Sequence, residues 1–134
     1  MESELICLDT SVLIDYFRKT KKENSFFYDL SKQYSLFAVS VVTEFEIFSG
    51  INSNQEEFWK KLFDQFTIIP MNSKIAKEAV DIYQSLKQNR KLIEVPDIFI
   101  GATARSKEIK LATINVKHFE RIDKLELIVP KTTA

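Results

Sequence analysis

The sequence predicts an α/β protein with a mostly parallel central sheet and helices on both faces. Short, continuous apolar runs such as LICL at 5–8 and SLFAVS at 35–40 are typical of buried parallel strands. Each run is followed by a segment with helical periodicity, and this alternation indicates strand–helix–strand units joined by right-handed crossovers. Only 2 glycines and 3 prolines occur, which favours regular elements connected by short loops.

The composition is that of one globular domain. With 134 residues, 45% of them hydrophobic, the chain is long enough to bury a core. We expect a single domain over residues 1–134, with a core from about 4 to 129 and a short C-terminal tail, KTTA. No segment resembles a signal peptide or a spanning helix, so we expect a soluble, cytoplasmic protein without a membrane partner. The only cysteine, Cys7, excludes a disulfide framework and is expected in a strand core.

The remaining elements follow in order along the chain. Strands are expected at 5–8, 35–40, 67–70, 111–114 and 125–129. Helices are expected at 11–18, 41–49, 54–66, 73–91 and 96–107, with a turn or short helix at 115–122. Gly50 is a natural stop for the second helix, and Pro96 suits the first turn of the fifth.

The charges of the chain balance, with 19 basic and 19 acidic residues. A general electrostatic attraction to nucleic acid is therefore not predicted, and a phosphate-binding surface would have to be a local patch. The run RKTKK at 18–22 is one candidate for such a patch. The alternative interpretation, which is the commoner one for such runs, is an ordinary solvated surface.

Two aspartates are expected at the same edge of the sheet. Asp9 directly follows the first strand, and Asp97 lies in the first turn of an apolar helix. In open α/β sheets, ligands bind beyond the carboxyl ends of the strands, where both side chains should lie. Each aspartate also has a structural interpretation, because an acid at the start of a helix caps free backbone N–H groups.

Glu44 is the third candidate acid. In the helix at 41–49, Val41, Phe45 and Phe48 are expected to form an inward stripe that includes Glu44, while Glu46 is expected to point away. An inward carboxylate needs a hydrogen-bond network, a cation or a buried basic partner. Clustered carboxylates repel one another, and a hard cation such as Mg²⁺ or Mn²⁺ binds oxygen ligands and relieves that repulsion.

The segment LATINVKHF adds neutral polar groups to the predicted edge. Thr113 offers a hydroxyl at a strand end, and Asn115 and His118 share a face if the turn is helical. A lone histidine is also commonly a hydrogen-bonded structural residue. The sequence contains neither a Walker loop nor GxGxxG, and no second aspartate lies two residues after Asp9, which argues against an aspartyl-phosphate phosphatase.

Four segments, in order, resemble the motifs of PIN-domain nucleases and especially of VapC toxins from VapBC toxin–antitoxin modules: CLDTSVLIDYFR, VSVVTEFEIFSG, VPDIFIGATA and LATINVKHFERI. The resemblance covers nearly the whole chain. It implies a Mg²⁺-dependent endoribonuclease, with Mn²⁺ as an alternative ion, that cleaves tRNA or another structured RNA and so inhibits translation and growth. The implied partners are the RNA substrate, a VapB-like antitoxin and a second copy of the chain.

The resemblance also implies roles for particular residues. The metal-binding acids of the family fall on Asp9, Glu44 and Asp97, and Asn115 joins them as a catalytic residue. Contacts with substrate or with metal-bound water are expected from Thr10, Ser11, Thr113 and His118. Many relatives carry a fourth acid in the last motif, where this sequence has Asn115 and His118.

Two other functions stay open at this point. A PIN-domain nuclease can act in RNA processing outside a toxin module, and the presence or absence of an antitoxin separates these cases. The missing fourth acid also motivates a catalytically weak binding module. A metal-dependent cleavage assay separates that alternative from an enzyme.

Overall fold

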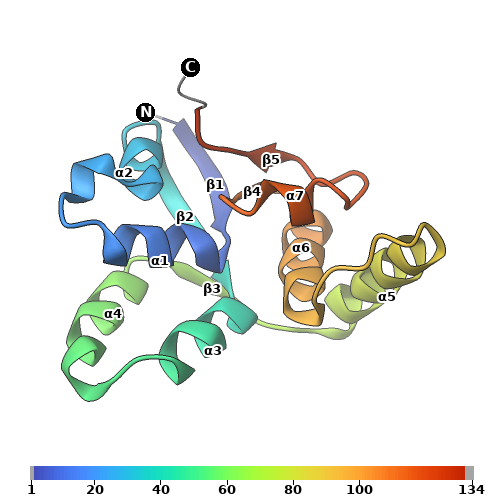
Figure 1. Ribbon diagram of the computed structural model, residues 1–134, viewed down its shortest axis with the longest axis horizontal. Helices are drawn as coiled ribbons and strands as arrows, with labels where there is room; N and C mark the ends of the chain where they lie inside the picture. The colour runs from blue at the N-terminus through green and yellow to red at the C-terminus, as the bar shows by residue number, and fades with distance from the viewer. Residues whose placement is uncertain (1, 132–134) are drawn as a thin grey trace.

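Five parallel strands form the centre of the protein (Figure 1). The computed structural model describes residues 2–131, so only Lys131 of the expected tail lies within the described part. The strands are β1 (Glu2–Leu8), β2 (Tyr34–Ser40), β3 (Thr67–Ile69), β4 (Lys110–Ala112) and β5 (Leu127–Ile128). Their order is β3-β2-β1-β4-β5, and each neighbouring pair is parallel. The predicted α/β class is therefore confirmed.

Helices cover both faces of this sheet, as predicted. The α-helices are α1 (Thr10–Arg18), α2 (Phe26–Ser31), α3 (Val41–Ser49), α4 (Glu56–Phe63), α5 (Ser73–Gln88), α6 (Val95–Lys107) and α7 (Val116–Phe119). Two short 3₁₀ turns, η1 (Lys22–Asn24) and η2 (Ser53–Gln55), precede α2 and α4. The helices α1, α2 and α4 contribute to one apolar cluster and α5 and α6 to the other, on opposite sides of the sheet.

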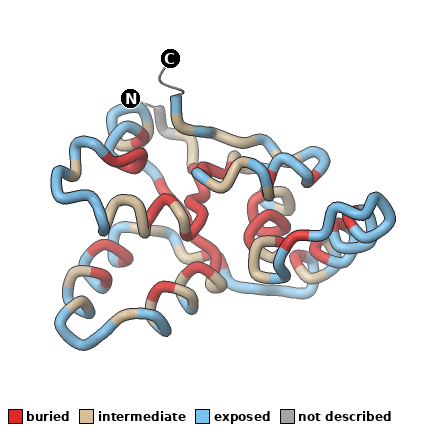
Figure 2. The backbone as a smooth tube through the Cα atoms, in the orientation of Figure 1, coloured by how far each residue is buried: buried red, intermediate tan, exposed pale blue. Residues whose placement is uncertain are grey.

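The alternation of side chains along β1 divides the core. Ile6 and Leu8 belong to the cluster with α1, α2 and α4, whereas Cys7 belongs to the cluster with α5 and α6. All three are fully buried, and Figure 2 shows buried backbone concentrated along this central strand. Burial raises the pKa of the Cys7 thiol to about 12, with a smaller contribution from the charge of Asp9. Cys7 is thus a core residue, as expected.

The direction of winding reverses between β1 and β4. From β1 the chain continues to β2 and β3 on one side, and only later returns to β4 and β5 on the other. Leu8 of β1 pairs with Ala112 of β4, and the Asp9 N–H donates to the Ala112 carbonyl at 2.9 Å. Such a switch in strand order opens a crevice at the carboxyl ends of the strands, which is the usual ligand site of these sheets.

Several elements differ in extent from the prediction. The helix α2 was not predicted, because six residues give too little periodicity; its start depends on Ser25, whose hydroxyl accepts from the Tyr28 N–H at 3.2 Å. The helices α4 and α5 are shorter than expected, and β5 spans two residues. Within the described part of the chain, no helix is long and apolar enough to cross a bilayer.

The predicted inward face of α3 was wrong. Phe45, expected in the core, is 71% exposed, while the buried residues of this helix are Thr43 and Ile47. The helix contacts α1, α4 and α6, and its Val42 and Phe48 pack against opposite core clusters. Because α3 is apolar on more than one side, the spacing of its apolar residues did not define which side packs.

Candidate active site

Asp9 is a buried carboxylate at the carboxyl end of β1. Its side chain is nearly inaccessible, at 2% exposure, and Oδ2 accepts hydrogen bonds from Ser11 Oγ at 2.6 Å and Thr113 Oγ1 at 2.8 Å. Asp9 occupies the N-cap position of α1 but makes no side-chain capping hydrogen bond. The structure therefore does not favour the interpretation of Asp9 as a helix cap.

Burial raises the pKa of Asp9 above its ordinary value. The hydrogen bonds from Ser11 and Thr113 stabilise the charged form and offset part of this effect, while the negative charge of Asp97 raises the pKa further. Two hydroxyl donors thus hold the charged carboxylate in place. None of the groups that shift its pKa is a cation. A cation at this position would stabilise the ionised form.

Asp97 faces the same region from the first turn of α6. Its Oδ2 lies 3.2 Å from His118 Nδ1, and that nitrogen lies 2.8 Å from Asn115 Nδ2. A protonated Nδ1 donates to Asp97, whereas an unprotonated Nδ1 accepts from the Asn115 amide. Among the described residues, Asp97 is bound by this side chain and not by the free N–H groups of its helix, so a pure capping role is not supported.

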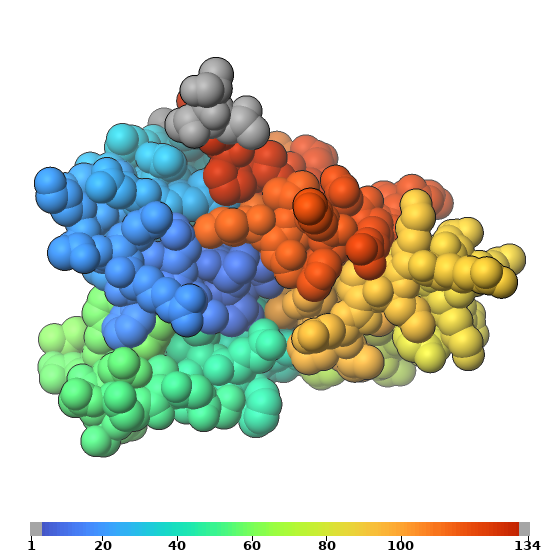
Figure 3. All heavy atoms as spheres, viewed as in Figure 1, coloured from blue at the N-terminus to red at the C-terminus, as the bar shows by residue number. Residues whose placement is uncertain are grey.

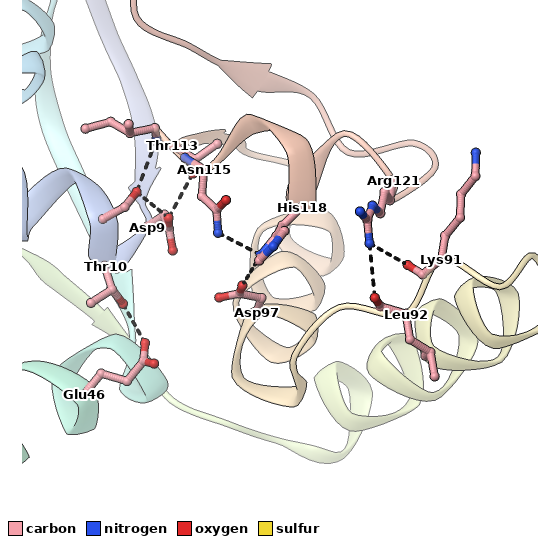
Figure 4. Close-up of polar contacts among 12 residues, drawn as sticks. Asp9, Thr10, Glu46, Lys91, Leu92, Asp97, Thr113, Asn115, His118 and Arg121 are labelled. Carbon is pink, nitrogen blue, oxygen red and sulfur yellow. Dashed lines mark hydrogen bonds and ion pairs between the residues drawn. The ribbon is translucent and has the colours of Figure 1, made fainter.

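Glu46 supplies the third carboxylate near this region. Its Oε1 accepts from Thr10 Oγ1 at 2.7 Å, and Thr10 Oγ1 also lies 3.0 Å from Thr43 Oγ1. Partial burial raises the pKa of Glu46; the Thr10 hydrogen bond opposes this, and the charges of Asp97, Asp9 and Glu94 raise it further. Figure 4 shows Asp9, Glu46 and Asp97 around one region at the edge of the sheet.

Glu44, the acid predicted for this position, lies elsewhere. It lines a surface groove with Val41, Phe45, Phe48 and Lys60, between α3 and α4. The structure thus brings Asp9 and Asp97 together as predicted, but places Glu46 with them in place of Glu44. Glu46 follows Thr43 by three residues and so shares the side of the helix on which Thr43 is buried, but no local pattern in the sequence shows that this side is buried.

The polar residues predicted to contact substrate all lie in this network. Ser11 and Thr113 donate to Asp9. Thr10 donates to Glu46, and His118 contacts Asp97 (Figure 4). Two backbone N–H groups also donate to these hydroxyls: the Ile114 N–H donates to Ser11 Oγ at 3.2 Å and so joins the segments after β1 and β4, and the Asn115 N–H donates locally to Thr113 Oγ1 at 2.9 Å. Their roles toward a substrate stay predictions.

The donor chemistry fits a hard divalent cation. Three carboxylates converge from β1, α3 and α6, and the pKa values of two of them are raised by burial and mutual repulsion. Oxygen-only donors suit Mg²⁺ or Mn²⁺. Within residues 2–131, no three His, Cys, Asp or Glu side chains are already grouped closely enough to hold an ion. Binding would therefore require the carboxylates to draw together.

A parallel sheet with an acidic cluster beyond its switch point defines an α/β protein with a carboxylate site, and the comparisons with known proteins specify its family. The PIN domain model matches residues 6–125. Ribonuclease VapC1 from Methanocaldococcus jannaschii is 35% identical over 127 residues, which cover 94% of this chain and 87% of that protein. Ribonuclease VapC10 from Mycobacterium tuberculosis is 30% identical over 123 residues, 91% of each chain.

Solved structures agree with these relatives. A toxin–antitoxin complex from Klebsiella pneumoniae contains a chain that matches with a TM-score of 0.76 and 29% identity, covering 98% of this chain and 100% of that one. A chain of VapBC2 from Rickettsia felis, bound to a DNA fragment from its promoter, has the same fold, with a TM-score of 0.80, 23% identity and coverage of 95% and 99%. The protein belongs to the PIN-domain family and, within it, to the VapC ribonucleases.

Proposed function

We propose that this protein is a divalent-metal-dependent endoribonuclease that acts as the toxin of a toxin–antitoxin module. The observation that carries the proposal is the convergence of Asp9, Glu46 and Asp97 at the switch point of a VapC-type PIN domain. We propose residues 1–134 as one such domain. Hydrolysis of a phosphodiester bond in tRNA or another structured RNA would then stop translation and growth.

In this proposal Asp9, Glu46 and Asp97 supply the carboxylate oxygens for the metal. Glu46 replaces Glu44, because Glu46 interacts electrostatically with both aspartates whereas Glu44 lines a different groove. Bound Mg²⁺ or Mn²⁺ would polarise the scissile phosphodiester and lower the pKa of a water for attack on phosphorus. The charge of three carboxylates suits either ion, and an activity comparison of the two identifies the better one.

The neighbouring polar groups orient these acids. Ser11 and Thr113 fix the Asp9 carboxylate, and Thr10 fixes Glu46. Asn115 and His118, which stand where many relatives carry a fourth acid, position Asp97 and contact the substrate or water beside it. Neutral groups can orient a carboxylate without adding the charge that attracts a cation.

We propose a VapB-like antitoxin as the protein partner. The Klebsiella pneumoniae and Rickettsia felis matches are toxin–antitoxin complexes, and this chain is 35% identical to a VapC ribonuclease. A homodimer is the expected assembly of the toxin. A PIN-domain nuclease of RNA processing, in contrast, would have no antitoxin and would not arrest growth when expressed alone.

The test combines cleavage and growth. Purified wild type should cleave RNA with Mg²⁺ or Mn²⁺ and stop when EDTA is added, while Asp9→Asn should lose about 100-fold or more of the rate. Expression of wild type should arrest growth, and coexpression of the antitoxin should relieve the arrest. Equal arrest by wild type and Asp9→Asn at matched protein levels would remove the nuclease explanation. RNA binding without metal-dependent cleavage would favour the binding-module alternative.

A further inference from the structure

The basic run at 18–22 divides into structural and free cations. Lys22 Nζ donates to three main-chain carbonyls at the end of α1, those of Tyr16 at 2.7 Å, Phe17 at 2.8 Å and Lys19 at 2.9 Å. The Lys19 ammonium lies 3.5 Å from Asp15 Oδ1. These two lysines therefore stabilise α1 and its connection, and they are not available to a ligand without breaking those contacts.

Arg18, in contrast, makes no contact of this kind. It is exposed, and its side chain makes no hydrogen bond or ion pair with any described residue. It lies two helical turns after Ser11, roughly 10 Å along the axis of α1. Its cationic guanidinium offers five donors in a planar fork that matches a phosphate.

Arg18 lines two grooves beside α1; one extends to Ser11, which binds Asp9, and the other includes Glu46. The first, of about 520 Å³, extends from Ser11 to Arg18 and is also lined by the paired Asp15 and Lys19. The second, of about 320 Å³, includes Glu46, Ile14 and Arg18 and lies against α4. Figure 3 shows the surface of the N-terminal segment, in blue, meeting that of the segment around residues 110–120, in orange, on this face. Arg18 is the cation that both grooves share.

Electrostatics explain why a free cation at this position matters. The candidate active site is acidic and the whole chain carries no net charge, so the protein has no general attraction for a polyanion. The carboxyl end of a helix normally repels anions, but the Lys22 ammonium binds three carbonyls at the end of α1 and opposes that effect. A phosphate can therefore approach the guanidinium of Arg18.

We infer that Arg18 binds a backbone phosphate of the RNA substrate, in the grooves that lead from α1 to the carboxylates. This inference rests on the proposed ribonuclease function and adds to it a contact outside the carboxylate site. Arg18 would position the RNA strand so that a phosphodiester roughly 10 Å away, the length of two turns of α1, lies over Asp9. It would not take part in the chemistry itself, so its loss should affect substrate affinity and leave the bond-breaking step intact.

The experiment compares Arg18→Ala and Arg18→Lys with Lys77→Ala. Lys77 is an exposed, unpaired lysine of α5 on the opposite face of the sheet, so its replacement removes the same charge at a distance. For cleavage of a single-stranded RNA at low salt, Arg18→Ala should raise KM about three- to fivefold with kcat within twofold of wild type. Arg18→Lys should recover part of the affinity, and Lys77→Ala should match wild type.

The salt dependence of RNA affinity reports on a direct contact between Arg18 and a phosphate. A purely structural role of Arg18 would leave that dependence unchanged. In an Asp9→Asn background, RNA affinity should fall with salt, and Arg18→Ala should reduce the slope of log K against log[salt] by about 0.7, the value for one phosphate of a single strand. An unchanged slope and KM in Arg18→Ala would overturn the inference, as would equal losses in Arg18→Ala and Lys77→Ala. If wild type failed to cleave RNA, the proposed function would fall, while the slope comparison would still test Arg18.

Discussion

The carboxylate of Asp9 should destabilise the metal-free protein as pH rises. Its pKa is raised in the folded state, chiefly by burial, so between the unfolded and folded pKa values the folded protein binds more protons than the unfolded chain. Stability is therefore highest below the unfolded value and is lost as pH rises through the folded pKa. Above both values the destabilisation is constant.

Asp9→Asn should remove this pH dependence. The amide oxygen can still accept from Ser11 and Thr113, but no charge has to be buried. In chelator, the variant should be more stable than wild type near neutral pH, and the difference should grow from acid pH and then level off. Urea unfolding of both proteins across that pH range measures it. A constant difference at all pH values would contradict the assignment to Asp9.

Replacing Glu44 and Glu46 separately tests which of the two belongs to the carboxylate site. Glu46→Gln should lower kcat by about 100-fold, because it removes a charged ligand while keeping the shape and the Thr10 hydrogen bond. Glu44→Gln should stay within about twofold of wild type, because Glu44 lines a separate groove. RNA cleavage under identical metal conditions gives the comparison. The reverse ranking would restore the assignment made from the sequence.

The same pair shows why the site was only partly predictable from the sequence. Asp9 and Asp97 could be placed at one edge because the topology of a parallel sheet carries strand ends and helix starts there. Glu44 and Glu46 lie in one helix with apolar residues on several sides, and only tertiary packing selects the side that faces the sheet. Two of the helices that pack against α3, α1 and α6, come from distant parts of the chain.

At the scale of elements, the connection after α1 depends on one lysine. Lys22 ends the helix through three carbonyl contacts, and its ammonium lies 5.1 Å from the ring centroid of Tyr16 and 5.8 Å from that of Phe17. The basic residues of the run look alike in the sequence, because charge alone does not distinguish a capping lysine from a solvated one. The carbonyls that Lys22 binds become available only when α1 stops at Arg18.

Lys22→Met should destabilise the protein by about 1–2 kcal/mol, since it keeps the apolar stem but leaves the helix carbonyls without their charged donor. Lys19→Met should cost at most about 0.5 kcal/mol, because its ion pair with Asp15 is partly exposed. Chemical unfolding of both variants measures the two values. Equal values would show that the run acts only through its total charge.

At the scale of the whole molecule, the fold class followed from the sequence more readily than the strand order. Alternating apolar strands and amphipathic helices indicate a parallel α/β sheet, because crossovers have a fixed hand and helices must cover both faces. The order β3-β2-β1-β4-β5 depends on which strand ends pair, such as Leu8 with Ala112, and no local pattern encodes that choice. The switch point, and with it the crevice, emerges only from the assembled sheet.

Metal binding should therefore stabilise the molecule as a whole, because the three acids come from elements on both sides of the sheet. A cation that binds only the folded state adds RT ln(1 + [L]/Kd), about 2.7 kcal/mol at a hundredfold excess over Kd. Asp97→Ala should forfeit most of that gain. In chelator it should change stability little, since within residues 2–131 the Asp97 side chain makes no capping hydrogen bond to its helix and its loss relieves repulsion with Asp9.

Thermal unfolding in EDTA and across a Mg²⁺ or Mn²⁺ titration tests this expectation, with Asp29→Ala as the matched control. Asp29 also lies in the first turn of a helix, α2, but is exposed and lines a groove that contains none of the three carboxylates. Asp29→Ala should keep the full increase of Tm with metal, and Asp97→Ala should show little of it. If all three proteins responded to metal in parallel, Asp97 would not be a ligand, even if its variant failed to cleave RNA. The increase of Tm with metal thus shows whether Asp97 is a metal ligand or a helix cap. Loss of activity alone does not distinguish these two roles.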